Sequence, residues 1–163
     1  MTQARRYVRP VLLGGFIAGS IDVGAACLIN KLPPLTILQA IASGVLGKLA
    51  FHSGLPAAVL GLVLQWAMSI LIAVIFAAAA QRLAILMRRW VVSGLGYGVA
   101  VYFVMNFVVV PLSAAPFARK FTLLKSIEDL LAMLLFGLII AYFGRQAAAG
   151  GTASSEPLKS IAT

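Results

Sequence analysis

The chain is poor in charged side chains, and poorest in acidic ones. Only 10% of its 163 residues are charged, and four acidic residues stand against 13 Lys and Arg, which gives a formal net charge of +9. Soluble domains carry about 25% charged residues. Here 62% of the residues are hydrophobic and the mean hydropathy is +1.04. These proportions exclude an ordinary soluble domain and predict an all-α, helical integral membrane protein.

Cysteine and histidine are also scarce, since Cys27 and His52 are the only ones. One cysteine cannot form an internal disulfide, and one Cys with one His falls short of an ordinary zinc ligand set. An intramembrane enzyme would need a nucleophile and a base, or two metal ligands, at one depth. We therefore expect no metal, no cofactor and no enzymatic activity.

The basic residues lie in short clusters between apolar runs, which is typical of orientation signals and of contacts with anionic lipids rather than nucleic acid. With a cytoplasmic N-terminus, eight basic residues fall inside and five outside. The inside set is Arg5, Arg6, Arg9, Arg82, Arg88, Arg89, Arg145 and Lys159, and the outside set is Lys31, Lys48, Arg119, Lys120 and Lys125. The bias predicts that both termini are cytoplasmic and that the bilayer, not nucleic acid, is the partner.

Four apolar stretches are long enough to cross a hydrocarbon core of about 30 Å. They predict a four-span membrane domain over residues 11–144, with spans at about 11–30, 55–80, 91–111 and 127–144. Residues 1–10 are then a cytoplasmic N-terminus. Residues 145–163 are rich in Ala, Gly and Ser and lack periodicity, so they predict a disordered cytoplasmic tail.

Residues 35–51, after Pro33 and Pro34, form a further helical pattern. Small and polar residues at Thr36, Gln39, Ser43 and Gly47 alternate with apolar ones at helical spacing. Three interpretations stay open: an amphipathic interfacial helix, which we favour, a re-entrant segment, and a true fifth span.

Asp22 is the most informative single residue, because it lies in the middle of the first apolar stretch. A charged side chain at the bilayer centre costs roughly 2.5–3.5 kcal/mol on insertion scales, so such residues usually face a protein interior, a cavity or a partner. Gly15, Gly19 and Asp22 share one helix face. Small residues allow close helix packing, so we predict packing faces at Gly15 and Gly19, and by the same pattern at Gly61, Gly94 and Gly98.

Depth along the helices predicts which polar side chains meet Asp22. At about 1.5 Å per residue, Asp22 and Tyr102 lie roughly 16 Å from the cytoplasmic boundary and Gln65 roughly 15 Å from the outer one. We predict a polar cluster of Asp22, Gln65 and Tyr102 near the midplane, with Asn106 one turn farther out. Such a cluster can lock helices together, relay protons or contact a solute, or meet another subunit.

Glu128 and Asp129 resemble a pair of catalytic carboxylates. Ser126 with Asp129, however, fits a capping box at the start of the fourth span, where anionic side chains suit the positive helix end. We predict capping there.

Three segments resemble parts of small bacterial multi-span inner-membrane proteins without an assigned activity. These segments are Gly14–Asp22, Leu38–Gly44 and Tyr102–Asn106, and the resemblance covers about Val11 to Ser113. It implies a multi-pass protein of the bacterial inner (plasma) membrane and no catalytic residue.

Two functions follow as expectations. The first is a helix-packing membrane protein that forms homo-oligomers or serves as an accessory subunit of a membrane complex, because glycine-rich faces need only packing. The second is proton-linked or small-solute permeation, in which Asp22 lines the pathway.

Overall fold

The structure is a computed structural model that describes residues 3–116 and 123–152. Every regular element in these ranges is helical, as the composition predicts. The long helices are α1 (Gln3–Asn30), α3 (Gly54–Arg82), α5 (Trp90–Val104) and α7 (Leu123–Thr152). The shorter ones are α2 (Pro34–Leu46), the 3₁₀-helix η1 (Gly47–Phe51), α4 (Ala84–Arg88), the π-helix η2 (Met105–Val109) and α6 (Val110–Leu112).

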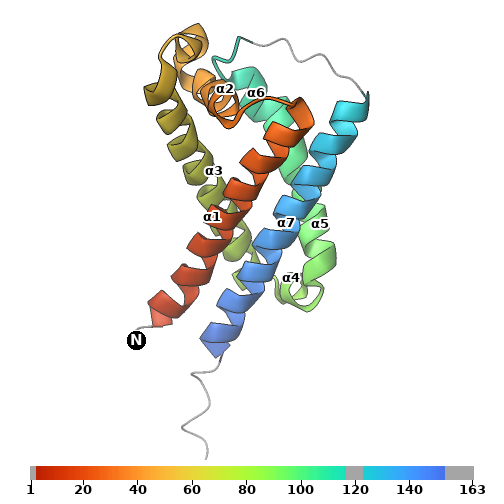
Figure 1. Cartoon of the computed structure of the whole chain (residues 1–163). Helices are drawn as coiled ribbons and strands as arrows, with labels where there is room; N and C mark the ends of the chain where they lie inside the picture. The colour runs from red at the N-terminus through yellow and green to blue at the C-terminus, as the bar shows by residue number, and fades with distance from the viewer. Residues whose placement is uncertain (1–2, 117–122, 153–163) are drawn as a thin grey trace, which may run out of the picture.

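Successive long helices run in opposite directions (Figure 1). Near the start of α1, the Tyr7 hydroxyl donates a hydrogen bond of 2.8 Å to the carbonyl of Ala77, close to the end of α3. At the other end of α1, the Asn30 side-chain oxygen accepts one of 3.4 Å from Nζ of Lys125, near the start of α7. The four helices therefore form an up-down-up-down bundle.

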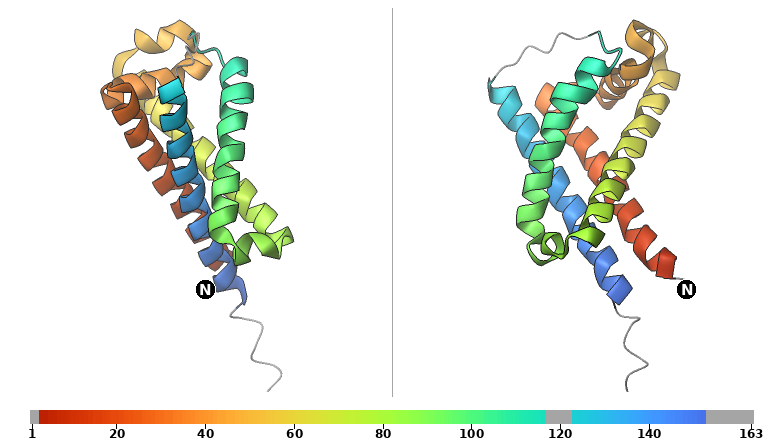
Figure 2. Two further views of the ribbon diagram at one scale, coloured as in Figure 1. Left: turned by 90° about the vertical axis from the view of Figure 1, so that its right-hand side faces the viewer. Right: turned by 180° about the vertical axis from the view of Figure 1, so that it is seen from behind.

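The bundle is closed at one end and splayed at the other. α3 and α5 approach each other at α4 and move apart toward the end that carries α2 and α6, while α7 lies between α1 and α5 (Figure 2). At the splayed end, the backbone N–H of Ala114, just after α6, donates a 2.9 Å hydrogen bond to the carbonyl of Gly44 on α2. The short helices α2 and α6 thus connect the parts of the bundle that move apart at this end.

By length and composition alone, four described segments could cross a membrane: Tyr7–Asn30, Pro34–Phe51, Gly54–Arg82 and Trp90–Leu112. Pro34–Phe51 begins and ends at the same end of the bundle, because α1 ends and α3 begins there (Figure 1). It therefore does not run from one end of the bundle to the other, as a membrane-spanning helix would. α7 carries the predicted span 127–144 and packs along both α1 and α5, which makes it the fourth member of the bundle.

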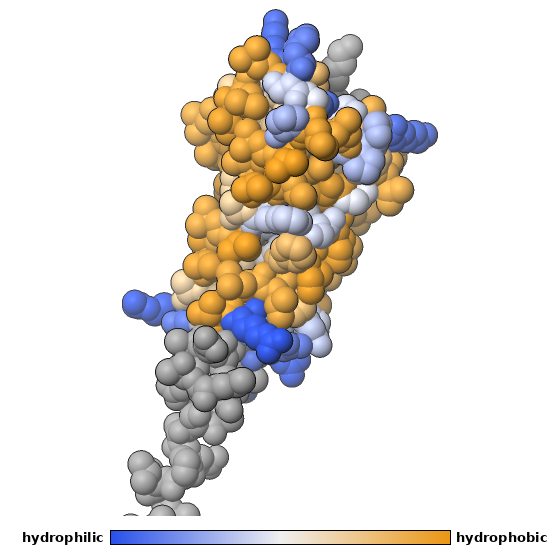
Figure 3. All heavy atoms as spheres, turned by 60° about the vertical axis from the view of Figure 1, so that its left-hand side comes forward, coloured by the Kyte–Doolittle hydropathy of each residue, from blue (hydrophilic) through white to orange (hydrophobic). Residues whose placement is uncertain are grey.

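The outer surface is apolar and the interior is made of small residues. Outward side chains such as Leu28 (80% exposed) and Phe107 (62%) belong to a broad apolar belt, and hydrophilic residues gather toward the two ends of the molecule (Figure 3). Inside, Phe76 and Ile140 are the only large apolar side chains among those that are fully buried in the described residues. Such a broad apolar surface is suited to lipid rather than water.

Aromatic residues mark the end of the bundle where α5 begins. The rings of Trp90 and Tyr142 lie 5.9 Å apart, and the guanidinium carbon of Arg145 lies 6.0 Å from the Trp90 ring centre. Trp and Tyr prefer the level of the lipid headgroups, so these contacts place a membrane–water boundary here.

Two predicted boundaries were wrong. α7 continues to Thr152, so residues 145–152 are helical, because Ala147, Ala148 and Ala149 are strong helix formers that extend the span. Residues 153–163 of the predicted tail lie outside the described residues. α7 is already helical at Leu123, so Ser126 lies within the helix and does not cap it.

Candidate polar site in the bundle

Asp22 is placed by the small-residue face of α1. Gly15 and Gly19 are buried on this face, and Asp22 follows as a half-buried side chain on the same stripe. A Cβ atom on Gly15 would lie 2.7 Å from Cα of Ile70, and one on Gly19 would overlap the hydroxyl of Ser69. The two glycines thus allow the backbones of α1 and α3 to approach closely at the level of Asp22.

Gln65 on α3 is the direct partner of Asp22. Its Nε2 donates a 2.8 Å hydrogen bond to Oδ2 of Asp22 and lies 3.4 Å from the carbonyl oxygen of Gly19. One turn along, the Ser69 hydroxyl donates to the carbonyl of Gln65 at 2.8 Å. Asp22 and Gln65, predicted to share one depth, therefore meet across the α1–α3 seam.

A second pair on the same seam was not predicted. Nε1 of Trp66 donates a 3.2 Å hydrogen bond to the Ser20 hydroxyl, and its ring centre lies 4.6 Å from that of Phe16. Phe16 and Ser20 are one turn apart on α1 and therefore share a face. This spacing was the feature of the sequence that could have indicated a common partner. Trp66 adds a polar N–H and a broad ring beside the Asp22–Gln65 pair.

Asp22 has an amide partner and no cationic one. Within the described residues it forms no ion pair with Lys or Arg, and its polar contact is the neutral side chain of Gln65. The carboxylate of Asp129 on α7 also acts electrostatically on Asp22, and the two negative charges repel each other. Among the described residues, no Lys or Arg side chain therefore pairs with the negative charge of Asp22.

Tyr102 and Asn106 lie on a different seam. Nδ2 of Asn106 donates a 2.8 Å hydrogen bond to the carbonyl of Tyr102, and in the described residues no hydrogen bond joins either side chain to Asp22 or Gln65. The reason is that α5 packs on α7, which separates it from α1 (Figure 2). Of the four predicted residues, the structure joins Asp22 with Gln65 and places Tyr102 with Asn106.

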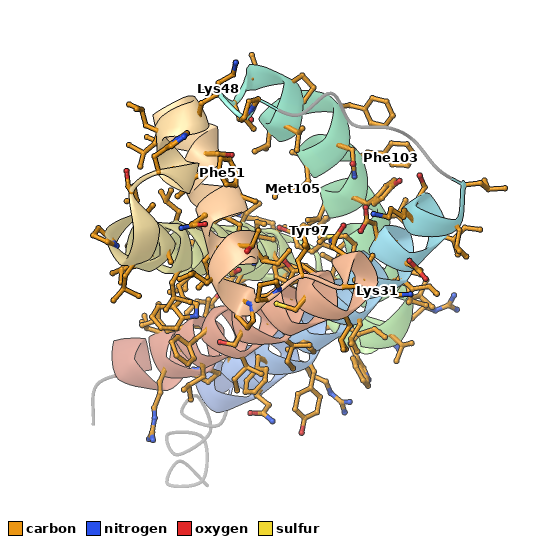
Figure 4. All side chains as sticks on the ribbon, turned by 45° about the horizontal axis from the view of Figure 1, so that its top comes forward. Lys31, Lys48, Phe51, Tyr97, Phe103 and Met105 are labelled. Atoms are coloured by element: carbon orange, nitrogen blue, oxygen red, sulfur yellow. The ribbon has the colours of Figure 1, made fainter. Side chains whose placement is uncertain are left out.

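The side chains of α5 and η2 are divided between the bundle and the outer surface. Tyr97 points inward, where its hydroxyl donates a 2.7 Å hydrogen bond to the carbonyl of Ile72 on α3, whereas Phe103 points outward and is 52% exposed (Figure 4). Asn106 is buried, and its Oδ1 has no hydrogen-bond partner. This oxygen lies in a π-helical turn, a distortion that is frequent at functional sites.

The predicted packing glycines all lie at contacts between helices of this chain. A Cβ on Gly61 would overlap the Leu38 carbonyl oxygen on α2, and one on Gly94 would lie 2.9 Å from Cβ of Ala141 on α7. Gly98 is equally close to α7.

Two further glycines at helix contacts were not predicted. A Cβ on Gly14 of α1 would lie 2.6 Å from Cβ of Phe143, and Gly137 on α7 faces Gly94. Both complete small-residue patterns on their helices.

α2 packs with its polar stripe toward the protein. Gln39 and Ser43 are buried, and Gln39 donates a 3.1 Å hydrogen bond to the carbonyl of Gly54. Val45, at the end of α2, and Leu49, on η1, are 63% and 67% exposed. A helix resting on the membrane surface would turn its polar side to water. The observed polarity therefore argues against the favoured interfacial helix and for the re-entrant alternative.

The described residues contain no cluster of three or more His, Cys, Asp or Glu side chains able to hold a metal ion. His52 lies outside the bundle core, with Nδ1 at 3.2 Å from the carbonyl of Lys48. The site on the α1–α3 seam therefore offers a carboxylate, an amide and a hydroxyl, which can bind or transfer a proton or contact a small polar solute.

The fold and the apolar surface define the class: this is an all-α integral membrane protein with a four-helix bundle and an additional short helix after the first span. Comparison with family models, with curated proteins and with solved structures gave no match.

Proposed function

We propose that this chain is a permeation protein of the bacterial inner membrane, with both termini cytoplasmic, in which Asp22 takes up and releases protons or contacts a small cationic solute. The observation that carries the proposal is the pairing of a mid-bundle carboxylate with the neutral amide of Gln65 at 2.8 Å.

The physical argument concerns charge balance. A structural carboxylate inside a membrane is usually neutralised by Lys or Arg, because an isolated charge in hydrocarbon costs several kcal/mol. An amide hydrogen bond orients a carboxylate but carries no net charge. Because no described Lys or Arg pairs with Asp22, we propose that its neutralising charge comes from a proton or from a mobile cation.

Accessibility supports the same function. Asp22 is half-buried, and Ser20 and Trp66 extend the polar surface along the α1–α3 seam. Four spans alone seldom enclose a conduit, so we propose that the pathway runs along this seam and is completed by a second copy of the chain.

Replacing Asp22 with Asn tests this function directly. The variant keeps an oxygen that can accept the Gln65 hydrogen bond and loses only the charge, so the fold is expected to survive. We expect proton flux into liposomes, followed with an enclosed pH-sensitive dye, to fall to the level of protein-free liposomes. Glu128→Gln, at the end of the bundle, is the matched control and should retain flux. Equal flux in the wild type and in Asp22→Asn would reject the proposal.

A second candidate is an assembly role, as a homo-oligomer or as an accessory subunit. Gly24 on α1 and Gly96 on α5 face open space, with no atom within 4 Å of a Cβ placed there. Helices of another chain could therefore approach closely at these positions. Native mass spectrometry of the protein extracted in mild detergent distinguishes the candidates: a stoichiometric foreign subunit favours the accessory role, and a homo-oligomer fits the pathway between copies.

A further inference from the structure

A groove lies on the lipid-facing side of the bundle, between the first half of α1 and the last half of α3, away from Asp22. Its volume is about 230 Å³ and its lining is almost entirely apolar. Val11 and Ala77 form a buried floor, at 5% and 3% exposure, whereas Leu12 and Val74 on its edges are 43% and 46% exposed. The groove is thus open to the surrounding lipid along its length.

The groove has a fixed wall at the end nearer the termini. Tyr7 lines it, and the hydrogen bond of 2.8 Å from its hydroxyl to the carbonyl of Ala77 ties the start of α1 to α3. Ala78, opposite, contributes only a methyl group. A rigid aromatic wall facing small residues leaves room for a flexible hydrocarbon chain.

The same end of the groove is flanked by positive charge. Arg9 follows the lining residue Val8, and Arg82 follows the lining residue Gln81; both arginines are exposed. None of the four acidic residues lies on α3 or on α1 before Asp22. Arginine matches phosphate geometry, and basic residues near the membrane surface attract anionic lipids.

From this arrangement we infer that the groove binds one anionic phospholipid, with an acyl chain lying on Val11 and Ala77 and the phosphate contacted by Arg9 and Arg82. An apolar groove with an exposed arginine next to a lining residue on each of its two helices fits an amphiphile with one negative headgroup.

Lipid titration followed by native mass spectrometry tests the inference on the full-length protein. The probes are phosphatidylglycerol and phosphatidylcholine with identical acyl chains. We expect phosphatidylglycerol to bind more tightly, and Arg9→Gln or Arg82→Gln to weaken it by about fivefold each, while Arg88→Gln, an exposed arginine of the α4 region, leaves it unchanged.

Filling the groove is the second arm of the test. Ala78→Phe puts a ring into it from an exposed position, so the fold is expected to hold, and bound phosphatidylglycerol should be lost; Ala100→Phe, exposed on α5, is the control. Equal binding of the two lipids by the wild type would overturn the inference. So would a dimer that Ala78→Phe dissociates while lipid binding persists, because a second copy would then occupy the groove.

Discussion

Replacing Gly98 with Val is expected to lower the free energy of unfolding by about 3 kcal/mol, because it forces two helix backbones apart. A Cβ on Gly98 would lie 2.9 Å from Cα of Leu134 and would overlap the carbonyl oxygen of Met133 on α7. Neither atom belongs to a flexible side chain that could move away. Gly137 on α7 meets Gly94 and Gly98 in the same way, so this contact has no Cβ on either side at its closest points.

The matched control is Gly96→Val, two residues away on the same helix. A Cβ there meets no atom within 4 Å, so the variant carries the same change in helix propensity without the collision. Unfolding in mixed micelles, driven by a denaturing detergent and followed by circular dichroism, gives the comparison. Similar losses in both variants would show that helix propensity, and not the α5–α7 contact, determines the effect.

Gly61→Leu is expected to release α2 from α3. A Cβ on Gly61 would overlap the carbonyl oxygen of Leu38 and lie 2.7 Å from its carbon, so a larger side chain cannot be accommodated while α2 stays in place. The buried cluster of Ala42, Ala50 and Ala57 would open with it. The four long helices do not depend on this contact, so the bundle itself should remain folded.

Cysteine labelling measures this release, because Cys27 can be replaced by Ser to give a cysteine-free chain. Ser43→Cys places a thiol where the native side chain is fully buried, and Lys48→Cys places one on the exposed part of η1. Gly61→Leu should speed maleimide modification at position 43 by about tenfold or more and leave position 48 unchanged. Continued protection at position 43 would mean that α2 is held by other contacts.

The sequence predicted the parts of the structure that depend on one helix at a time. Span positions follow from hydropathy, and the buried face of α1 follows from the spacing of Gly15, Gly19 and Asp22. The partnership of Asp22 with Gln65 was accessible because consecutive membrane-spanning helices usually lie next to each other. The similar depth of Asp22 and Gln65 in the membrane, counted along each helix, was then enough to predict that their side chains meet.

The predictions that failed are those that depend on which helices become neighbours. Tyr102 belongs to α5, which α7 separates from α1. Height along a helix does not give the direction around the bundle. For α2, the pattern showed two faces correctly but not which one meets protein. Burial of Gln39 and Ser43 became clear only once α3 was seen to supply Gly61 and the Gly54 carbonyl as partners.

The contact between α5 and α7, in which Gly94, Gly98 and Gly137 bring the backbones together, has a consequence for how this protein tolerates mutation. Large apolar residues, which are costly to truncate in water-soluble proteins, mostly face the lipid here and can be exchanged for one another. The smallest residues hold the architecture. An alanine scan that removes atoms would therefore find few sensitive positions beyond buried large residues such as Phe76 and Ile140, whereas a scan that adds a single methyl group at each glycine would locate the positions that natural variation is least free to change.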